Sequence, residues 1–269
     1  MSGINLTGAM RSNLLSLNNT QSQINSTQNR LATGLKVSSA IDNPRNFFQA
    51  QSLSNRASDL TNRLDGMKIG VRTLQAADEG IKAMTKVVET MAAVVKDAKD
   101  TLAAGDNADD LETQYNDLRE QLQQIADDSG YNGINLLGDN DLTIDFNEDA
   151  SSKITVSAVD WAGSAAEPAG LIDADFDTEA TTEESAVNAA LDSLRSTAAE
   201  FGNNLSTVRI REDFTKGMVN TLKGGSDDLT LADENEEAAN LLALQTRQQL
   251  GVQALSLASQ SQQGILRLF

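Results

Sequence analysis

The chain has 269 residues, 4% of which are aromatic and two of which are proline, and its formal net charge is −18. It contains no cysteine and no histidine, which excludes disulfides, thiol nucleophiles, imidazole bases and the commonest transition-metal ligands. Strong acidity argues against a nucleic-acid partner, and no apolar run is long enough for membrane insertion.

The acidic residues are unevenly distributed along the chain. All 39 lie between Asp42 and Glu237, so the first 41 and the last 32 residues carry no side-chain carboxylate. Such ends suit places where many copies pack together, because stacked like charges repel one another and are costly to desolvate. The charge pattern therefore predicts that both ends are assembly surfaces.

The first predicted helix covers residues 10–31. Apolar residues recur every seven positions at Met10, Leu17, Ile24 and Leu31, with Leu14 four residues after the first. Gly34 favours a helix C-terminus and Pro44 disfavours helix at the residue before it, so these two bracket a connection. The N-terminus also lacks the apolar segment of a secretory signal, so export would need another route.

The strongest periodic signal predicts a long helix over residues 46–102, roughly 85 Å long at about 1.5 Å per residue. Its seam is a heptad series without a miss, made of Leu53, Leu60, Met67, Leu74, Ile81, Val88, Val95 and Leu102. The alternate apolar positions change register near Ala77, as in a stammer. Such a seam predicts a coiled-coil rod that pairs with a helix from the second half of the chain.

After residue 102, an Ala-Ala-Gly-Asp-Asn turn leads into a shorter amphipathic helix that ends at Gly130, and a loop follows to Gly138. Residues 139–178 then alternate between apolar and polar side chains. This period of two predicts a β-hairpin that turns near residues 149–152. The insert carries the only tryptophan, Trp161, and we expect it to be the most exposed part of the molecule.

A calcium-loop template matches at four acidic positions, namely Asp173, Asp175, Asp177 and Glu184. However, Thr178 stands where the template requires glycine, and no helix precedes the loop. In so acidic a chain, a solvated loop that enters a capped helix is the better interpretation. We therefore expect no metal site and no cofactor, and no catalytic constellation stands out either.

Helix is predicted to resume at Thr181, where Thr181 and Glu184 form a capping-box signature, and to continue to Leu222. The sequence Gly-Gly-Ser at residues 224–226 is expected to break it. A last helix then runs from about Ala232 to the C-terminus. Its apolar residues lie on more than one side, which a lone helix at a chain end cannot bury.

Both terminal helices are therefore expected to be disordered in the monomer and to fold on assembly. The predicted assembly interface consists of their apolar residues: Met10, Leu14, Leu17, Ile24, Leu31, Leu241, Leu244, Leu250, Leu255, Leu257, Ile265, Leu268 and Phe269.

Several segments of the sequence match a known family. Residues 30–37 read Arg-Leu-Ala-Thr-Gly-Leu-Lys-Val, residues 74–80 read Leu-Gln-Ala-Ala-Asp-Glu-Gly, and residues 265–269 read Ile-Leu-Arg-Leu-Phe. The segment Leu-Leu-Ala-Leu-Gln-Thr-Arg-Gln-Gln-Leu at residues 241–250 is similar as well. In these places the chain resembles bacterial flagellin, the subunit of the flagellar filament. The likeness covers both ends, about residues 1–130 and 185–269.

The resemblance implies a non-enzymatic structural subunit that is secreted unfolded and self-assembles into an extracellular homopolymer. The partners it implies are an export chaperone, the export apparatus, the filament cap and the hook-filament junction proteins. Two alternatives remain open: a hook-filament junction protein, and a secreted helical interaction protein or adhesin that never polymerises.

The predicted fold is mainly α, an elongated antiparallel coiled-coil rod with paired terminal helices and a small β-hairpin insert. We expect residues 1–43 and 223–269 to form the terminal-helix filament core, residues 44–138 and 179–222 the rod, and residues 139–178 the outer insert.

Overall fold

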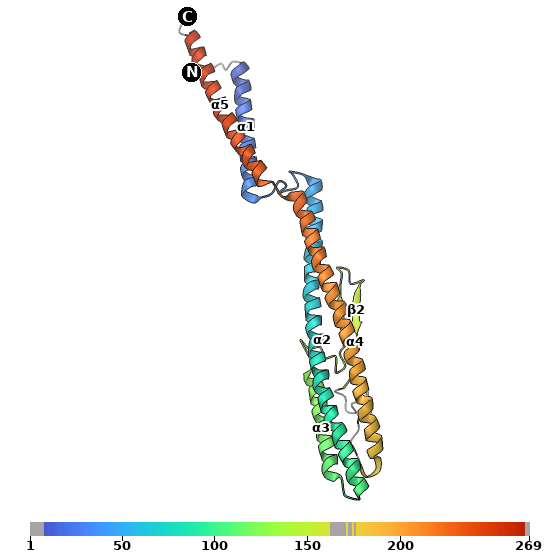
Figure 1. Cartoon of the computed structure of the whole chain (residues 1–269). Coiled ribbons are helices and arrows are strands. Elements are labelled where there is room, and N and C mark those ends of the chain that lie inside the picture. The colour runs from blue at the N-terminus through green and yellow to red at the C-terminus, as the bar shows by residue number, and fades with distance from the viewer. Residues whose placement is uncertain (1–7, 162–170, 172–173, 175, 267–269) are drawn as a thin grey trace. The chain divides into compact units, whose positions relative to one another are not determined.

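The computed structural model describes residues 8–161, 171, 174 and 176–266. In this part of the chain the helices are α1 (Gly8–Thr33), α2 (Pro44–Ala104), α3 (Asp109–Asp128), α4 (Phe176–Thr230) and α5 (Glu234–Leu266), and the strands are β1 (Leu142–Asp145) and β2 (Lys153–Val156) (Figure 1). The predicted mainly α fold with a small antiparallel hairpin is confirmed. The chain divides into two compact units, unit 1 (Met1–Asn55 and Leu222–Phe269) and unit 2 (Arg56–Thr221).

In unit 1, the segments that follow α1 and α4 are tied together by backbone hydrogen bonds. Helix α1 ends at Thr33 because Gly34 adopts a positive φ of 68°, a conformation that glycine accepts at little cost. The Lys36 backbone N–H then donates to the carbonyl oxygen of Thr230 at 2.7 Å, and the Ala232 N–H donates to that of Gly34 at 2.9 Å. These bonds hold the two connections side by side.

The start of α2 is fixed by two side chains of the preceding loop. One carboxylate oxygen of Asp42 accepts hydrogen bonds from the backbone N–H and the hydroxyl of both Ser38 and Ser39, at 2.9 to 3.1 Å. The bonds from Ser39 and then Ser38 lower the pKa of Asp42 below its ordinary value. Asn43 caps the helix by accepting from the Asn46 N–H at 3.1 Å, so the helix begins at the next residue, proline.

Helix α4 continues through Gly224-Gly225-Ser226, so the predicted break there is wrong. The glycines allow α4 to lie close to α2, since a Cβ atom on Gly225 would stand 3.4 Å from Leu53 Cδ1. The Ser226 hydroxyl donates to the carbonyl oxygen of Ala50 at 3.2 Å. Small residues that favour a turn in isolation are here kept helical by this packing. Helix α5 begins after Asp233, which caps the N–H groups of residues 235 and 236.

The heptad positions of α2 form the core of unit 2. The buried members are Leu60, Met67, Leu74, Ile81, Val88 and Val95, whereas the end members Leu53 and Leu102 are half-buried. Helix α4 buries its own series at Val187, Leu194, Phe201 and Val208. An ion pair between Lys99 and Glu184 joins the two helices at one end of this unit. Helices with such seams stabilise each other chiefly by removing apolar surface from water.

Helix α4 begins at Phe176, so Thr181 lies inside the helix and the predicted capping box is wrong. A different helix supplies the cap, because the Phe176 N–H donates to the Glu112 carboxylate of α3 at 3.3 Å. The Phe176 ring is buried and packs edge-on against Tyr115, with ring centroids 5.6 Å apart. These tertiary contacts start α4 earlier than the local sequence predicts.

The calcium-template residues do not form a described site. Asp173 and Asp175 lie outside the residues that the structure describes, and residues 177–184 are helical, whereas the template requires a loop. Within the described ranges, no group of three or more acidic side chains could hold a metal ion.

The hairpin forms as predicted, but the described residues of the insert do not bear out the expectation that it is the most exposed part, because its inner face is buried. Strand β1 pairs antiparallel with β2, and Leu142 lies opposite Val156. Both of these side chains are buried, and Ile144 packs directly on Gly70 of α2. Trp161 is fully buried, and its backbone N–H donates to the carbonyl oxygen of Leu137 at 2.8 Å. The inner face of the insert is therefore part of the core of unit 2.

A buried polar contact joins α3 to α4 in unit 2. The Tyr115 hydroxyl donates to the Glu183 carboxylate at 2.8 Å, and both side chains are fully buried. Burial, and then the neighbouring Glu183, raise the pKa of the Tyr115 hydroxyl far above its ordinary value. We expect this pair to favour one register of α3 against α4, since a slip would separate the buried partners.

Candidate assembly surface

Helices α1 and α5 pack against each other in an antiparallel pair. Arg30 near the end of α1 contacts Glu237 at the start of α5, and Gln248 donates a hydrogen bond to Gln21 further along. At Gly251 the helices approach closely, since a Cβ atom there would stand 3.0 Å from Leu17 Cδ2. The chain thus brings its two carboxylate-free ends together.

The contact surface of this pair is narrow and partly polar. On α1 the buried side chains are Met10, Thr20, Ile24 and Thr27. The buried Thr20 hydroxyl has its hydrogen-bond partner within its own helix, since it donates to the Ser16 carbonyl oxygen at 2.9 Å. Apart from Glu237, the α5 residues that face α1 are at most half-buried in the described part. The pair alone therefore removes little of the apolar surface of α5 from water.

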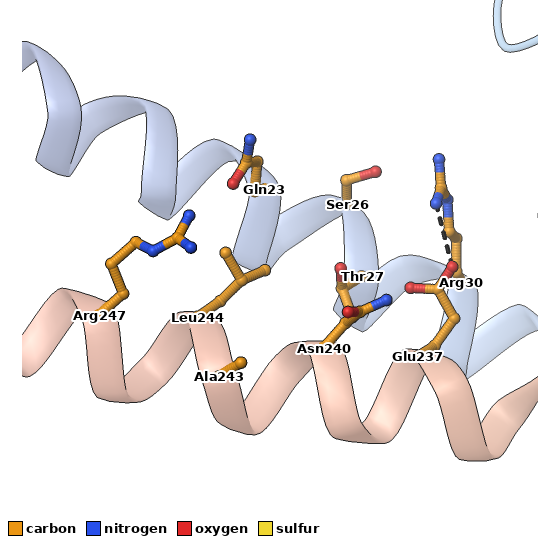
Figure 2. A pocket seen from close by; sticks show the side chains of 9 residues that line it. All are labelled: Gln23, Ser26, Thr27, Arg30, Glu237, Asn240, Ala243, Leu244 and Arg247. Atoms are coloured by element: carbon orange, nitrogen blue, oxygen red, sulfur yellow. Dashed lines mark hydrogen bonds and ion pairs between the residues drawn. The ribbon is translucent and has the colours of Figure 1, made fainter.

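A groove of about 360 Å³ runs between α1 and α5 near the ion pair (Figure 2). Its lining is mostly amide, hydroxyl and charged: Gln23, Ser26, Thr27, Arg30, Glu237, Asn240, Ala243, Leu244 and Arg247. The lining contains no histidine or cysteine, and none of its hydroxyl groups is shown hydrogen-bonded to a base. The groove therefore has the mixed, mainly polar character of the rim of a protein interface.

The ion pair between Arg30 and Glu237 lies at 3.0 Å, with the two side chains 40% and 9% exposed. Replacing Arg30 by glutamine leaves the buried carboxylate without its cation, and we expect a loss of about 1–2 kcal/mol in the pairing of α1 with α5. The measurement is the temperature at which assembled polymers fall apart, which should decrease. Arg72→Gln on the exposed side of α2 in unit 2 is the control, and an equal decrease in that variant would contradict the role of the ion pair.

The predicted interface residues fall into three groups in the structure. Met10 and Ile24 are buried in the α1–α5 pair, and Leu17, Leu31, Leu241, Leu244 and Leu255 are half-buried. The exposed members are Leu14, Leu250 and Leu257. Leu268 and Phe269 lie outside the described residues, and only the helical backbone of Ile265 is described. The structure therefore separates residues that hold the pair together from residues that face away from it.

Three of the four large apolar residues that are exposed in the described part of α5 form one stripe, and the fourth, Val252, lies on another side of the helix. Leu242, Leu250 and Leu257 are 60–70% exposed. They lie on the same side of the helix, because at 3.6 residues per turn their directions differ by less than a quarter of a turn. We call these three residues the outer stripe. No carboxylate side chain occurs in α5 beyond Glu237. An uncharged leucine stripe of this kind is typical of a surface that another helix covers.

The predicted interface omits six exposed apolar residues of unit 1. These are Leu15 on α1, Ile41 and Phe48 around the start of α2, Leu231 between α4 and α5, and Leu242 and Val252 on α5. Leu15 follows the predicted Leu14 directly, and Phe48 follows another phenylalanine, so adjacent apolar pairs were the available signal. One member of such a pair faces outward on any helix.

No helix in the described ranges is both long enough and apolar enough to span a bilayer.

Residues 4–141 match a family model described as the bacterial flagellin N-terminal helical region, and residues 185–269 match the bacterial flagellin C-terminal helical region. A flagellin of Brucella melitensis biotype 1 is 33% identical over 280 residues, which cover 95% of both chains. Flagellin FljK of Caulobacter vibrioides is 28% identical over 275 residues, covering 100% of this chain and 99% of the relative.

Among solved structures, the crystal structure of Bacillus cereus flagellin aligns with a TM-score of 0.46 at 18% identity, over 55% of this chain and 86% of that chain.

Proposed function

The chain belongs to the bacterial flagellin family and is a structural subunit of the flagellar filament, and we propose that it polymerises through the outward surface of α1 and α5. The predicted function is confirmed at the level of the filament subunit. The hook-filament junction protein and the non-polymerising adhesin are not favoured.

The observation that supports this surface is the outer stripe. Burial of a leucine side chain contributes about 1.5–3 kcal/mol, and each residue of the stripe has most of its surface still exposed in the single chain. Neighbouring subunits that cover the stripe would gain this energy repeatedly along the polymer. The absence of carboxylates from the last 32 residues means that this packing brings no acidic groups together. Disorder of the free ends before assembly stays a prediction.

The proposed layout places residues 1–43 and 223–269 in the filament core, residues 44–138 and 179–222 around it, and residues 139–178 outermost. The charge distribution supports this order, because most of the 39 acidic residues lie outside the two proposed core segments and would stay in contact with water. As a filament subunit the chain would act outside the cell. Its proposed partners are its own copies, an export chaperone, the export apparatus, the filament cap and the hook-filament junction proteins.

A structural role agrees with membership of a structural protein family. It also agrees with the lack of histidine and cysteine in the sequence.

Substitutions in the outer stripe test the proposed surface. Leu250→Ser and Leu257→Ser should each raise the critical concentration for seeded polymerisation by about tenfold, which corresponds to about 1.4 kcal/mol per subunit. Gln249→Ser is the matched control, because it changes an exposed neighbour without removing an apolar side chain. Unchanged critical concentrations for both leucine variants would rule out the stripe as a contact surface.

A further inference from the structure

The methionines of unit 2 differ sharply in exposure. Met67, Met84 and Met91 on α2 are fully buried, with 0% of each side chain exposed. Met218 on α4 is half-buried. These four are all the methionines that the sequence places in unit 2. Met218 is therefore the one thioether of this unit that solvent reaches in the folded chain.

The side chain of Met218 lines a hollow of about 240 Å³ at the end of the hairpin. Phe146 and Phe214 line the same hollow, and the first is buried whereas the second is 59% exposed. The hollow thus extends from the surface to the inner side of the hairpin. A Cβ atom on the neighbouring Gly217 would meet nothing within 4 Å, so the backbone beside Met218 is open as well.

A hollow of this size admits small polar molecules, because one water occupies only about 30 Å³ in the liquid. Hydrogen peroxide is little larger than water and reacts with thioethers. The sulfur lone pair forms a new S–O bond while the O–O bond of the peroxide breaks, and the leaving oxygen takes the proton of the transferred oxygen and departs as water. The sulfur is oxidised by two electrons to a sulfoxide, and the peroxide is reduced.

The hollow is also where the hairpin end contacts α4. The Arg211 guanidinium of α4 lies 5.3 Å from the centroid of the Phe146 ring, and Met218 lies further along the same helix in the same lining. A thioether packs favourably against aromatic rings, whereas a sulfoxide is polar and disrupts apolar packing. A change at this sulfur therefore acts on the contact between the hairpin and α4.

We propose that Met218 is the position at which hydroperoxides oxidise the folded unit 2, and that the sulfoxide weakens the attachment of the hairpin end to α4. The three buried methionines are protected, because their sulfur atoms meet an oxidant only when the core opens, and core openings are rare. The inference concerns the single folded chain and does not depend on polymerisation.

Peptide mapping by mass spectrometry tests the selectivity. Full-length monomers treated with hydrogen peroxide should form the sulfoxide at Met218 at least about tenfold faster than at Met67, Met84 or Met91. In concentrated urea the four rates should become equal, since the chain then exposes every thioether. Equal rates in the folded protein, or a Met218 that stays unoxidised, would overturn the proposal.

Urea unfolding followed by Trp161 fluorescence tests the consequence, since this side chain is buried in unit 2. Met218→Leu keeps a similar apolar volume but cannot be oxidised, and Met84→Leu is the matched control, which keeps the reactive sulfur. Peroxide treatment should lower the unfolding midpoint of the unmodified chain and of Met84→Leu, and should leave that of Met218→Leu unchanged. An equal decrease in Met218→Leu, or an unchanged midpoint in a fully oxidised unmodified chain, would contradict the proposed weakening.

Discussion

Removal of residues 1–35 or of residues 236–269 is expected to abolish filament growth while unit 2 stays folded. Each deletion removes one partner of the α1–α5 pair, and the remaining helix then loses both its partner and the surface it shares with it. Helices of 26 and 33 residues without tertiary packing are marginal in water, so neither should persist alone. Unit 2 has its own core, which neither deletion touches.

Circular dichroism measures whether unit 2 stays folded, and electron microscopy of seeded reactions measures whether filaments grow. The helical signal should fall only by the share of the deleted helix and its former partner, and the thermal transition of unit 2 should stay in place. Filaments of normal appearance from either truncated chain would refute the proposal that α1 and α5 drive assembly. Loss of the whole helical signal would instead show that unit 2 depends on the terminal helices.

The elements that the sequence predicted well are those governed by local periodicity. The heptad series in α2 predicts both the helix and the side that is buried, because one apolar side chain per two turns has to face a partner. The alternation at Leu142 and Ile144 predicts the hairpin for the same reason. In both cases the spacing of apolar residues within one segment is enough to predict the type of element and its buried side.

The errors arise where a distant segment overrides the local signal. Glu112 of α3 caps α4 at Phe176, which lies ahead of the predicted capping box at Thr181. Packing against Leu53 keeps α4 helical across Gly225. Trp161 is buried through contacts with a loop that its neighbouring residues do not specify. None of these contacts leaves a trace in the periodicity of its own segment, so propensity alone points elsewhere.

The candidate surface shows a related ambiguity. Apolar residues on several sides of α5 indicate several partners, but the pattern does not say which side the chain itself covers. Leu244 and Leu250 are equally apolar in sequence, yet the first lines the groove with α1 and the second is exposed. Only the antiparallel alignment of α1 with α5, fixed by contacts such as that between Arg30 and Glu237, separates the two sets.

The second large effect is expected at Gly80 of α2. A Cβ atom there would stand 2.1 Å from Ser129 Oγ, 2.7 Å from Ser129 Cβ and 2.8 Å from Leu137 Cδ1. Ser129 cannot easily move aside, because its hydroxyl donates to the Ile125 carbonyl oxygen at 2.6 Å, and Leu137 is fully buried. Gly80→Ala should therefore destabilise unit 2 by about 1–3 kcal/mol, despite the better helix propensity of alanine.

Two glycines of the same helix provide the controls for Gly80→Ala. Gly66 has no atom within 4 Å of the added Cβ, so Gly66→Ala should stabilise the helix by about 1 kcal/mol. Gly70→Ala should fall between the two, because its nearest neighbour is the flexible end of Ile144. Urea unfolding of monomers, followed by Trp161 fluorescence, measures this order, since the only tryptophan is buried in unit 2. A Gly80→Ala chain at least as stable as Gly66→Ala would show that the loop at Ser129 does not pack on α2 as described.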